Sequence, residues 1–264
     1  MIHQQNNGLI EFKGYAYNHS LMEKEIKIKT NDGKLIYGTL TYSKKKSEKL
    51  IIFVHGLGGH RNEHIHFNAS NFFRKHGFST FRFDLYSYGK KARAMSDCTI
   101  ALHGKDLNTV TDFFRKKFKT IDVIGHSLGG LTILASQTSK FDAIVFWDPA
   151  HTKYEWRHGE LDFKYDKKLD KYIINWGTEL LMGKQMFKEL VHGKDSSQSI
   201  KKIHKPIKII SAGKGVLMKT NRDYFKHANF PKEFVEIKNA DHNFNTEGTE
   251  EKLFKETLNF LKKF

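Results

Sequence analysis

Short apolar runs recur along the chain, and they predict strands that are buried on both faces. Two clear examples are residues 50–54 and 141–147, which together contain a single charged residue. Between them, residues 99–119 place leucine, valine and phenylalanine at roughly helical spacing. Continuous apolar strands that alternate with amphipathic helices are typical of an α/β protein, in which helices cover both faces of a parallel sheet.

The first part of the chain has a different pattern, which predicts an antiparallel hairpin. Residues 25–30 alternate between charged and apolar side chains, as a half-exposed strand does. Asn31-Asp32-Gly33 is a turn signal, and residues 34–42 resume a strand pattern. Such a hairpin fits the edge of a larger sheet. Further strands are expected at 78–83, from 121 onward, at 206–211 and at 233–237, with helices at 62–76, 131–136, 219–228 and 247–264.

Residues 151–204 interrupt this alternation. They are rich in lysine, aspartate, tyrosine, tryptophan and histidine, and they contain no apolar strand pattern. Short amphipathic helices are expected at 161–171 and 178–191. We interpret the segment as a cap inserted into a single domain that spans residues 1–264. Its aromatic residues, which either line an apolar pocket or form the core of the cap itself, are Tyr154, Trp156, Tyr165, Tyr172 and Trp176.

The chain is strongly basic, with a formal net charge of +16 from 45 Lys and Arg and 29 Asp and Glu. The lysines are scattered and interleaved with acidic residues, and this pattern favours solubility over nucleic-acid recognition. We therefore expect no nucleic-acid partner. Attraction to an anionic lipid surface or to an acidic acyl carrier fits the charge better.

Several features predict a cytoplasmic protein. No apolar run approaches the roughly 20 residues that a membrane-spanning helix needs. The polar residues 1–7 lack the basic start and apolar stretch of a signal peptide. The only cysteine, Cys98, has no partner for an intrachain disulfide.

A Gly-x-Ser-x-Gly motif, formed by Gly125, Ser127 and Gly129, joins a predicted strand to a predicted helix. This spacing suits a sharp turn that holds a serine hydroxyl above the sheet, in a strained backbone conformation. Glycines are expected around the serine because strand and helix pass close together there. The N–H of Leu128, at the start of the helix, is placed to bind a developing oxyanion. Ser127 is therefore a candidate nucleophile.

Four short motifs follow predicted strands, namely His55-Gly56-Leu57-Gly58-Gly59, Phe83-Asp84-Leu85-Tyr86-Ser87-Tyr88-Gly89, Gly125-His126-Ser127-Leu128-Gly129-Gly130 and Ala240-Asp241-His242-Asn243-Phe244. In this order and spacing, they resemble the α/β-hydrolase family over residues 24–264. The similarity is strongest to monoacylglycerol lipases, small carboxylesterases and serine-aminopeptidase-like hydrolases. The resemblance implies an α/β-hydrolase fold, with a mostly parallel eight-stranded sheet, helices on both faces and an inserted cap.

The resemblance also implies roles for individual residues. Ser127 would be the nucleophile, and His242, in the loop before the last helix, would be the base that takes its proton. The backbone N–H groups of Leu57 and Leu128 would form the oxyanion hole. His55 is expected to be structural, with a hydrogen bond to its own loop.

The acid of the catalytic triad is where the sequence departs from the family pattern. The resemblance places an aspartate after the seventh strand, but residues 211–217 contain no carboxylate. Asp148 follows the sixth strand in a Trp-Asp-Pro-Ala context, and pancreatic-type lipases carry their acid at a similar place. We therefore favour Asp148 as the group that orients His242. Asp223 and Asp241 remain alternatives, as does a serine–histidine dyad.

The activity implied by the resemblance is hydrolysis of a carboxylic ester through an acyl-enzyme, without a cofactor. Short acyl esters, monoacylglycerols and lysophospholipids all fit as substrates. The same residues would serve an acyl thioesterase or an acyltransferase. A non-catalytic binding protein of the same fold is the alternative from another class.

One segment resembles a zinc-binding pattern. His60-Arg61-Asn62-Glu63-His64 spells His-x-x-Glu-His, and His66 lies nearby. Zinc needs a third ligand and a long helix that carries the histidine pair. Because this segment begins the helix after the predicted oxyanion loop, no metal is expected.

Overall fold

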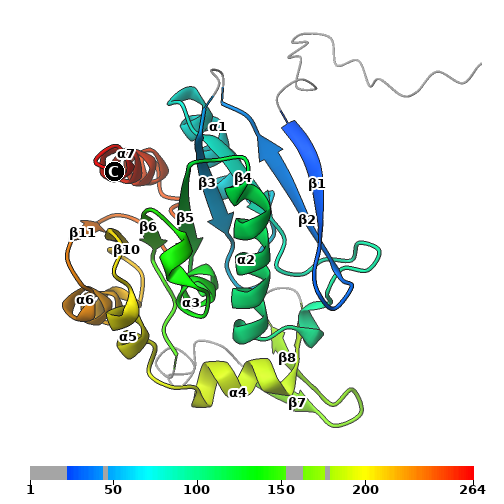
Figure 1. Cartoon of the computed structure of the whole chain (residues 1–264). Helices are drawn as coiled ribbons and strands as arrows, with labels where there is room; N and C mark the ends of the chain where they lie inside the picture. The colour runs from blue at the N-terminus through cyan, green and yellow to red at the C-terminus, as the bar shows by residue number, and fades with distance from the viewer. Residues whose placement is uncertain (1–22, 44–46, 153–162, 176–178) are drawn as a thin grey trace, which may run out of the picture.

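The computed structural model describes residues 23–43, 47–152, 163–175 and 179–264 of the chain (Figure 1). Its main sheet contains β1 (Glu23–Lys29), β2 (Leu35–Thr41), β3 (Lys49–Val54), β4 (Ser79–Phe83), β5 (Thr120–His126), β6 (Ile144–Trp147), β10 (Ile207–Ala212) and β11 (Lys232–Ile237). The order across the sheet is β1-β2-β4-β3-β5-β6-β10-β11. β1 pairs antiparallel with β2, and β2 with β4, whereas the other neighbours are parallel. The expected eight-stranded, mostly parallel sheet with its edge hairpin is confirmed.

Each face of the main sheet has its own apolar core. Along β3, Leu50, Ile52 and Val54 join one cluster, whereas Ile51 and Phe53 join the other. Successive residues of a strand point to opposite faces, so both faces of β3 are buried. The continuous apolar run of β3 therefore reflects burial on both faces, as predicted.

Helices cover both faces, as expected. α1 (His64–Lys75) and α7 (Thr249–Leu261) pack in one core, whereas α2 (Ile100–Arg115), α3 (Leu128–Leu134) and α6 (Met218–His227) pack in the other. In the view of Figure 1, α2 lies in front of the strands. Of the helices in the described residues, none has both the length and the apolar character that a bilayer crossing requires.

The carboxyl ends of the parallel strands meet at one edge of the sheet, because β3, β5, β6, β10 and β11 run in the same direction. Loops that leave neighbouring strands at this edge are close enough for their side chains to touch. The motifs after β3, β5 and β11 and the Asp148 turn after β6 therefore share one side of the molecule.

The segment between β6 and β10 differs from its expected structure. It contains β7 (Phe163–Asp166), β8 (Lys171–Asn175) and β9 (Glu179–Met182), which form a three-stranded antiparallel sheet, and then α4 (Lys184–His192) and α5 (Ser196–Ser199). The helix expected at 161–171 is wrong, because β7 and a turn occupy the described part of that range. The helix expected at 178–191 begins only at Lys184, after β9.

Cross-strand aromatic packing explains why these residues form strands. Tyr165 of β7 faces Tyr172 of β8 with ring centroids 5.2 Å apart, and Tyr172 stacks on Phe187 of α4 at 3.8 Å. Such pairs stabilise a small sheet and its packing against a helix. Tyr165 and Tyr172 therefore belong to the internal packing of this segment. The described residues do not include Tyr154, Trp156, Trp176 or residues 1–7.

Candidate active site

Ser127 lies in a sharp turn between β5 and α3. Its backbone angles are φ 52° and ψ −119°, a conformation that is costly for a residue with a Cβ atom. A Cβ atom at Gly129 would lie 2.2 Å from the carbonyl oxygen of Val54, and one at Gly125 would lie 2.6 Å from the carbonyl carbon of Gly129. The expected strain at the serine and the need for the flanking glycines are both confirmed.

Asp148 and His242 form a direct hydrogen bond, although 94 residues separate them in the chain. His242 Nδ1 lies 2.6 Å from Asp148 Oδ2. The Asp148 side chain is completely buried, whereas 37% of the His242 side chain is exposed. A buried carboxylate at Nδ1 holds the imidazole with its proton on that nitrogen, so that Nε2 is left as the basic atom.

The two alternative acids have other surroundings. Asp223 is exposed on the surface of α6. The carboxylate of Asp241 accepts a hydrogen bond from the backbone N–H of Asn245 at 2.8 Å, within its own turn. Of the three candidate acids, the structure brings Asp148 to His242.

The second oxygen of Asp148 is held by groups from β10 and α6. Asp148 Oδ1 accepts hydrogen bonds from the backbone N–H of Ala212 at 3.0 Å, the Ser211 hydroxyl at 3.2 Å and the Asn221 amide at 2.7 Å. Asn221 is fully buried and also donates to Ser211 Oγ at 2.8 Å. These donors satisfy a charge that would otherwise be costly to bury. Sequence reasoning missed Ser211 and Asn221, because only their burial distinguishes them from other polar residues.

His126, which precedes Ser127, contacts His242 directly. Its Nε2 lies 2.8 Å from the main-chain oxygen of His242, and the two rings are 4.9 Å apart. A carbonyl oxygen only accepts hydrogen bonds, so Nε2 of His126 carries the proton. Burial lowers the pKa of His126 to about 3, which keeps the ring neutral. His126 thus links the serine turn to the histidine loop, and sequence reasoning did not single it out.

His55 has the structural role expected from the sequence. Its Nδ1 lies 2.8 Å from the carbonyl oxygen of Gly56, and its Nε2 accepts the N–H of Leu85 at 3.0 Å. Because Nε2 accepts, Nδ1 must carry the proton and donate to Gly56. Burial lowers the pKa of His55 to about 4. The ring therefore fastens the loop after β3 to the loop after β4.

The two residues predicted to form the oxyanion hole share one environment. Leu57 follows β3, and Leu128 is the first residue of α3, where a backbone N–H has no acceptor within the helix. In the described residues, neither N–H donates a hydrogen bond. Their side chains join one apolar cluster with Ile174 of β8 and Met182 of β9. The small sheet therefore packs over the loop that contains Leu57.

The zinc-like pattern does not gather around one point. His66 is buried on α1, whereas about half of the His64 side chain is exposed. Across the residues that the structure describes, no three histidine, cysteine or carboxylate side chains are grouped as a metal site would require.

Comparison with protein families gives one match. The sequence model described as "Alpha/beta hydrolase family" matches residues 51–195 of the chain. No curated protein sequence matches the chain.

Several solved structures are similar to this chain over nearly their whole length. Est1E from Butyrivibrio proteoclasticus, in a structure with bound ferulic acid, is 21% identical with a TM-score of 0.77, over 90% of this chain and 98% of Est1E. The esterase domain of a Rhodothermus marinus protein is 18% identical with a TM-score of 0.73, over 92% and 99%. The esterase Pf2001 of Pyrococcus furiosus is 20% identical with a TM-score of 0.69, over 98% and 99%. These similarities establish the α/β-hydrolase fold that the motifs imply.

Proposed function

The chain belongs to the alpha/beta hydrolase family, and we propose on this basis that it hydrolyses carboxylic esters with Ser127, His242 and Asp148. The observation that carries the proposal is the 2.6 Å hydrogen bond between His242 Nδ1 and the buried Asp148 carboxylate. It lies at the same edge of the sheet as the strained turn of Ser127, and His126 connects the two. This arrangement has the parts that an activated serine needs.

The proposed reaction has two stages. Ser127 Oγ attacks the ester carbonyl while His242 Nε2 takes the hydroxyl proton, and the N–H groups of Leu57 and Leu128 stabilise the oxyanion. His242 then gives that proton to the departing alcohol, which leaves an acyl-serine. In the second stage, water loses a proton to His242 and attacks the acyl-serine, and Ser127 recovers its proton as the carboxylic acid leaves.

We propose three substrate classes, which are short acyl esters, monoacylglycerols and lysophospholipid-like esters. Ferulic acid is bound in the Est1E structure, so an ester of an aromatic carboxylic acid belongs in the same test. A thioester of an acyl carrier would react by the same steps. With an alcohol in place of water, the second stage becomes acyl transfer.

The test is hydrolysis of p-nitrophenyl esters of increasing chain length, together with labelling by a fluorophosphonate. We expect the wild type to turn over and to be labelled, and Ser127→Ala to lose at least about a thousandfold in kcat and all labelling. Ser136→Ala is the matched control, because Ser136 donates to the carbonyl of Ile133 at the end of α3 and should keep wild-type kinetics.

Two results would overturn the proposal. If the wild type neither hydrolyses any ester nor is labelled, the chain is a non-catalytic binding protein of this fold. If the wild type is labelled and forms mainly a new ester when an alcohol is added, it is an acyltransferase.

A further inference from the structure

A cleft of about 430 Å³ opens beside the loop that contains Leu57. Gly58 and Gly59 of that loop form part of its lining. Met95 and Leu180, which also line it, pack against the apolar cluster that contains Leu57 and Leu128. The volume is within the range of small-molecule sites. The cleft therefore adjoins the residues that would bind the oxyanion.

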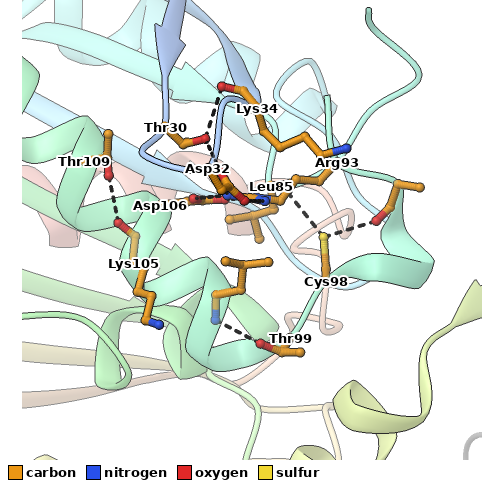
Figure 2. Close-up of polar contacts among 12 residues, drawn as sticks. Thr30, Asp32, Lys34, Leu85, Arg93, Cys98, Thr99, Lys105, Asp106 and Thr109 are labelled. Atoms are coloured by element: carbon orange, nitrogen blue, oxygen red, sulfur yellow. Dashed lines mark hydrogen bonds and ion pairs between the residues drawn. The ribbon is translucent and has the colours of Figure 1, made fainter. Parts of the chain in front are cut away.

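One wall of the cleft is formed by the loop between β4 and α2, and an ion-pair cluster around the buried Arg93 holds this loop in place (Figure 2). Arg93 donates to both oxygens of Asp106 on α2, at 2.6 and 2.9 Å, and to both oxygens of Asp32 in the β1–β2 turn, at 2.6 and 3.1 Å. The hydrogen bond to Asp106 raises the pKa of Arg93, so its charge is permanent. These contacts join the loop to α2 and to the β1–β2 turn, so the wall is ordered before a substrate binds. Pre-ordering of the wall reduces the entropy that is lost on binding.

A second set of contacts ties this wall to the loop after β3. The Tyr86 hydroxyl donates to the carbonyl oxygen of Gly56, in the loop after β3, at 3.4 Å. Within the wall itself, the Cys98 thiol donates to the carbonyl oxygen of Leu85 at 3.7 Å. Cys98 and Leu85 appear together in Figure 2. The cleft thus has a defined shape on the side that faces the predicted oxyanion hole.

The described lining of the cleft differs in charge from the strongly basic chain as a whole. Among the described residues that line it, there is no lysine or arginine, although the chain contains 45 of them. Two carboxylates, Asp84 and Glu179, are part of the lining. The nearby Arg61 is shared between Asp84 at 3.1 Å and Glu25 at 2.8 Å, so one guanidinium faces two carboxylates. Glu179 is exposed at the start of β9.

We propose that this cleft binds an uncharged, largely apolar group of the ester, and that Glu179 and Asp84 discriminate against anionic substrates. An anionic group in the cleft would lose hydration without meeting a lysine or arginine of the described lining, and it would lie near two carboxylates. The inference rests on the proposed ester hydrolysis and narrows it. Monoacylglycerols and simple alkyl or aryl esters fit, whereas lysophospholipids and the phosphate-bearing arm of an acyl carrier do not.

The charge test compares two substrates that share one acyl chain, monooctanoylglycerol and its phosphate monoester, both below their micelle concentrations. For the wild type, we expect kcat/KM to be at least about tenfold higher for the uncharged ester. Glu179→Lys should reduce this ratio about three- to tenfold. The charge-matched control is Glu48→Lys, which alters an exposed ion pair with Lys119 beside the amino end of β3, whereas the loop with Leu57 follows its carboxyl end. This variant should leave the ratio unchanged.

The location test fills the cleft. Leu180→Trp should lower the ratio of kcat/KM for p-nitrophenyl octanoate to that for p-nitrophenyl acetate about tenfold. Met95→Trp provides a second obstruction, from the loop between β4 and α2, in case the first variant does not fold. Activity on the acetate reports on folding in both variants.

Different results would contradict the proposed ester hydrolysis and the proposed role of the cleft. If Ser127 is labelled by fluorophosphonate and the anionic ester is hydrolysed as fast as the uncharged one, the charge discrimination is wrong. The same holds if Glu179→Lys leaves the ratio unchanged. If both tryptophan variants keep full activity on the octanoate, the cleft is not the binding site. Failure of the labelling itself would instead overturn the proposed ester hydrolysis.

Discussion

The loops that follow β6 and β10 are neighbours at the same edge of the sheet, yet they contribute different things to one carboxylate. β6 and β10 pair in parallel, with Trp147 opposite Ile210. The loop after β6 supplies the charge of Asp148, whereas the end of β10 supplies Ser211 and Ala212 as hydrogen-bond donors to it. The resemblance to the family places the acid in the second loop, which here has no carboxylate. The loop after β6 therefore supplies the charge, and the last residues of β10 supply hydrogen bonds that support it.

The positions in the two loops are close to equivalent in space. A Cβ atom at Gly215, in the loop after β10, would lie 3.1 Å from Asp148 Oδ2, the oxygen that binds His242. A side chain at Gly215 and the carboxylate of Asp148 would thus compete for one place. The comparison indicates that an acid can occupy any loop from which its carboxylate reaches Nδ1 of the histidine. The loops after the adjacent strands β6 and β10 are both close enough.

Removal of the Asp148 charge from the loop after β6 should lower the activity more than any other change considered below. Asp148→Asn keeps the shape of the side chain but favours the wrong tautomer of His242, so we expect kcat/KM for a p-nitrophenyl ester to fall about 10³- to 10⁴-fold. Asp223→Asn, on the exposed surface of α6, should stay within about twofold of the wild type. If Asp148→Asn kept more than about a tenth of the activity, the acid would have to be sought elsewhere.

The sequence predicted the parts of the molecule whose pattern is local. The strands of the main sheet were recognisable because residues such as Ile51 and Ile52 are buried on opposite faces, which leaves a continuous apolar run. The strain at Ser127 followed from the spacing of its glycines. Asp148 could be proposed as the acid because its Trp-Asp-Pro-Ala context resembles the place where pancreatic-type lipases carry theirs, although the sequence alone left Asp223 and Asp241 open.

The parts that sequence reasoning missed depend on contacts between distant segments. Asn221 is one polar residue on an amphipathic helix, and only the fold brings it to Asp148, 73 positions away. His126 was given no role from the sequence, because its hydrogen-bond partner is a main-chain atom of the distant His242. The strands β7 to β9 were missed because aromatic contacts such as that of Tyr172 with Phe187 stabilise them. The polar, lysine-rich sequence of this segment gives no apolar alternation from which strands could be predicted.

Transfer of the acid between the loops should have an intermediate effect. In Asp148→Gly, the φ angle of 39° at this position is well suited to glycine, and the site loses its charge. Adding Gly215→Asp puts a carboxylate in the loop after β10, from where it can reach the space that Asp148 vacates. We expect the double variant to recover about tenfold in kcat over Asp148→Gly alone. A folded double variant without recovery would mean that only the loop after β6 aims a carboxylate at His242.

Removal of one of the hydrogen bonds that hold Asp148 Oδ1 should have the smallest effect on kcat. Asn221→Ala removes one donor from Asp148 Oδ1, while the N–H of Ala212 and the hydroxyl of Ser211 remain. Because two of three hydrogen bonds persist, we expect kcat to fall only about three- to fivefold, with KM unchanged.

A matched control separates positioning of the acid from general stability. Thr220→Ala removes a buried hydrogen bond to the carbonyl oxygen of Leu217 in the same turn of α6. Among the described residues, the Asp148 carboxylate has its hydrogen bonds with groups other than Thr220. Both variants should lower Tm to a similar extent, but only Asn221→Ala should lower kcat and, in parallel, the rate of fluorophosphonate labelling. If Asn221→Ala lowers Tm and leaves kcat and labelling unchanged, the β10 side stabilises the fold without orienting the acid, and the loop after β6 positions Asp148 by itself.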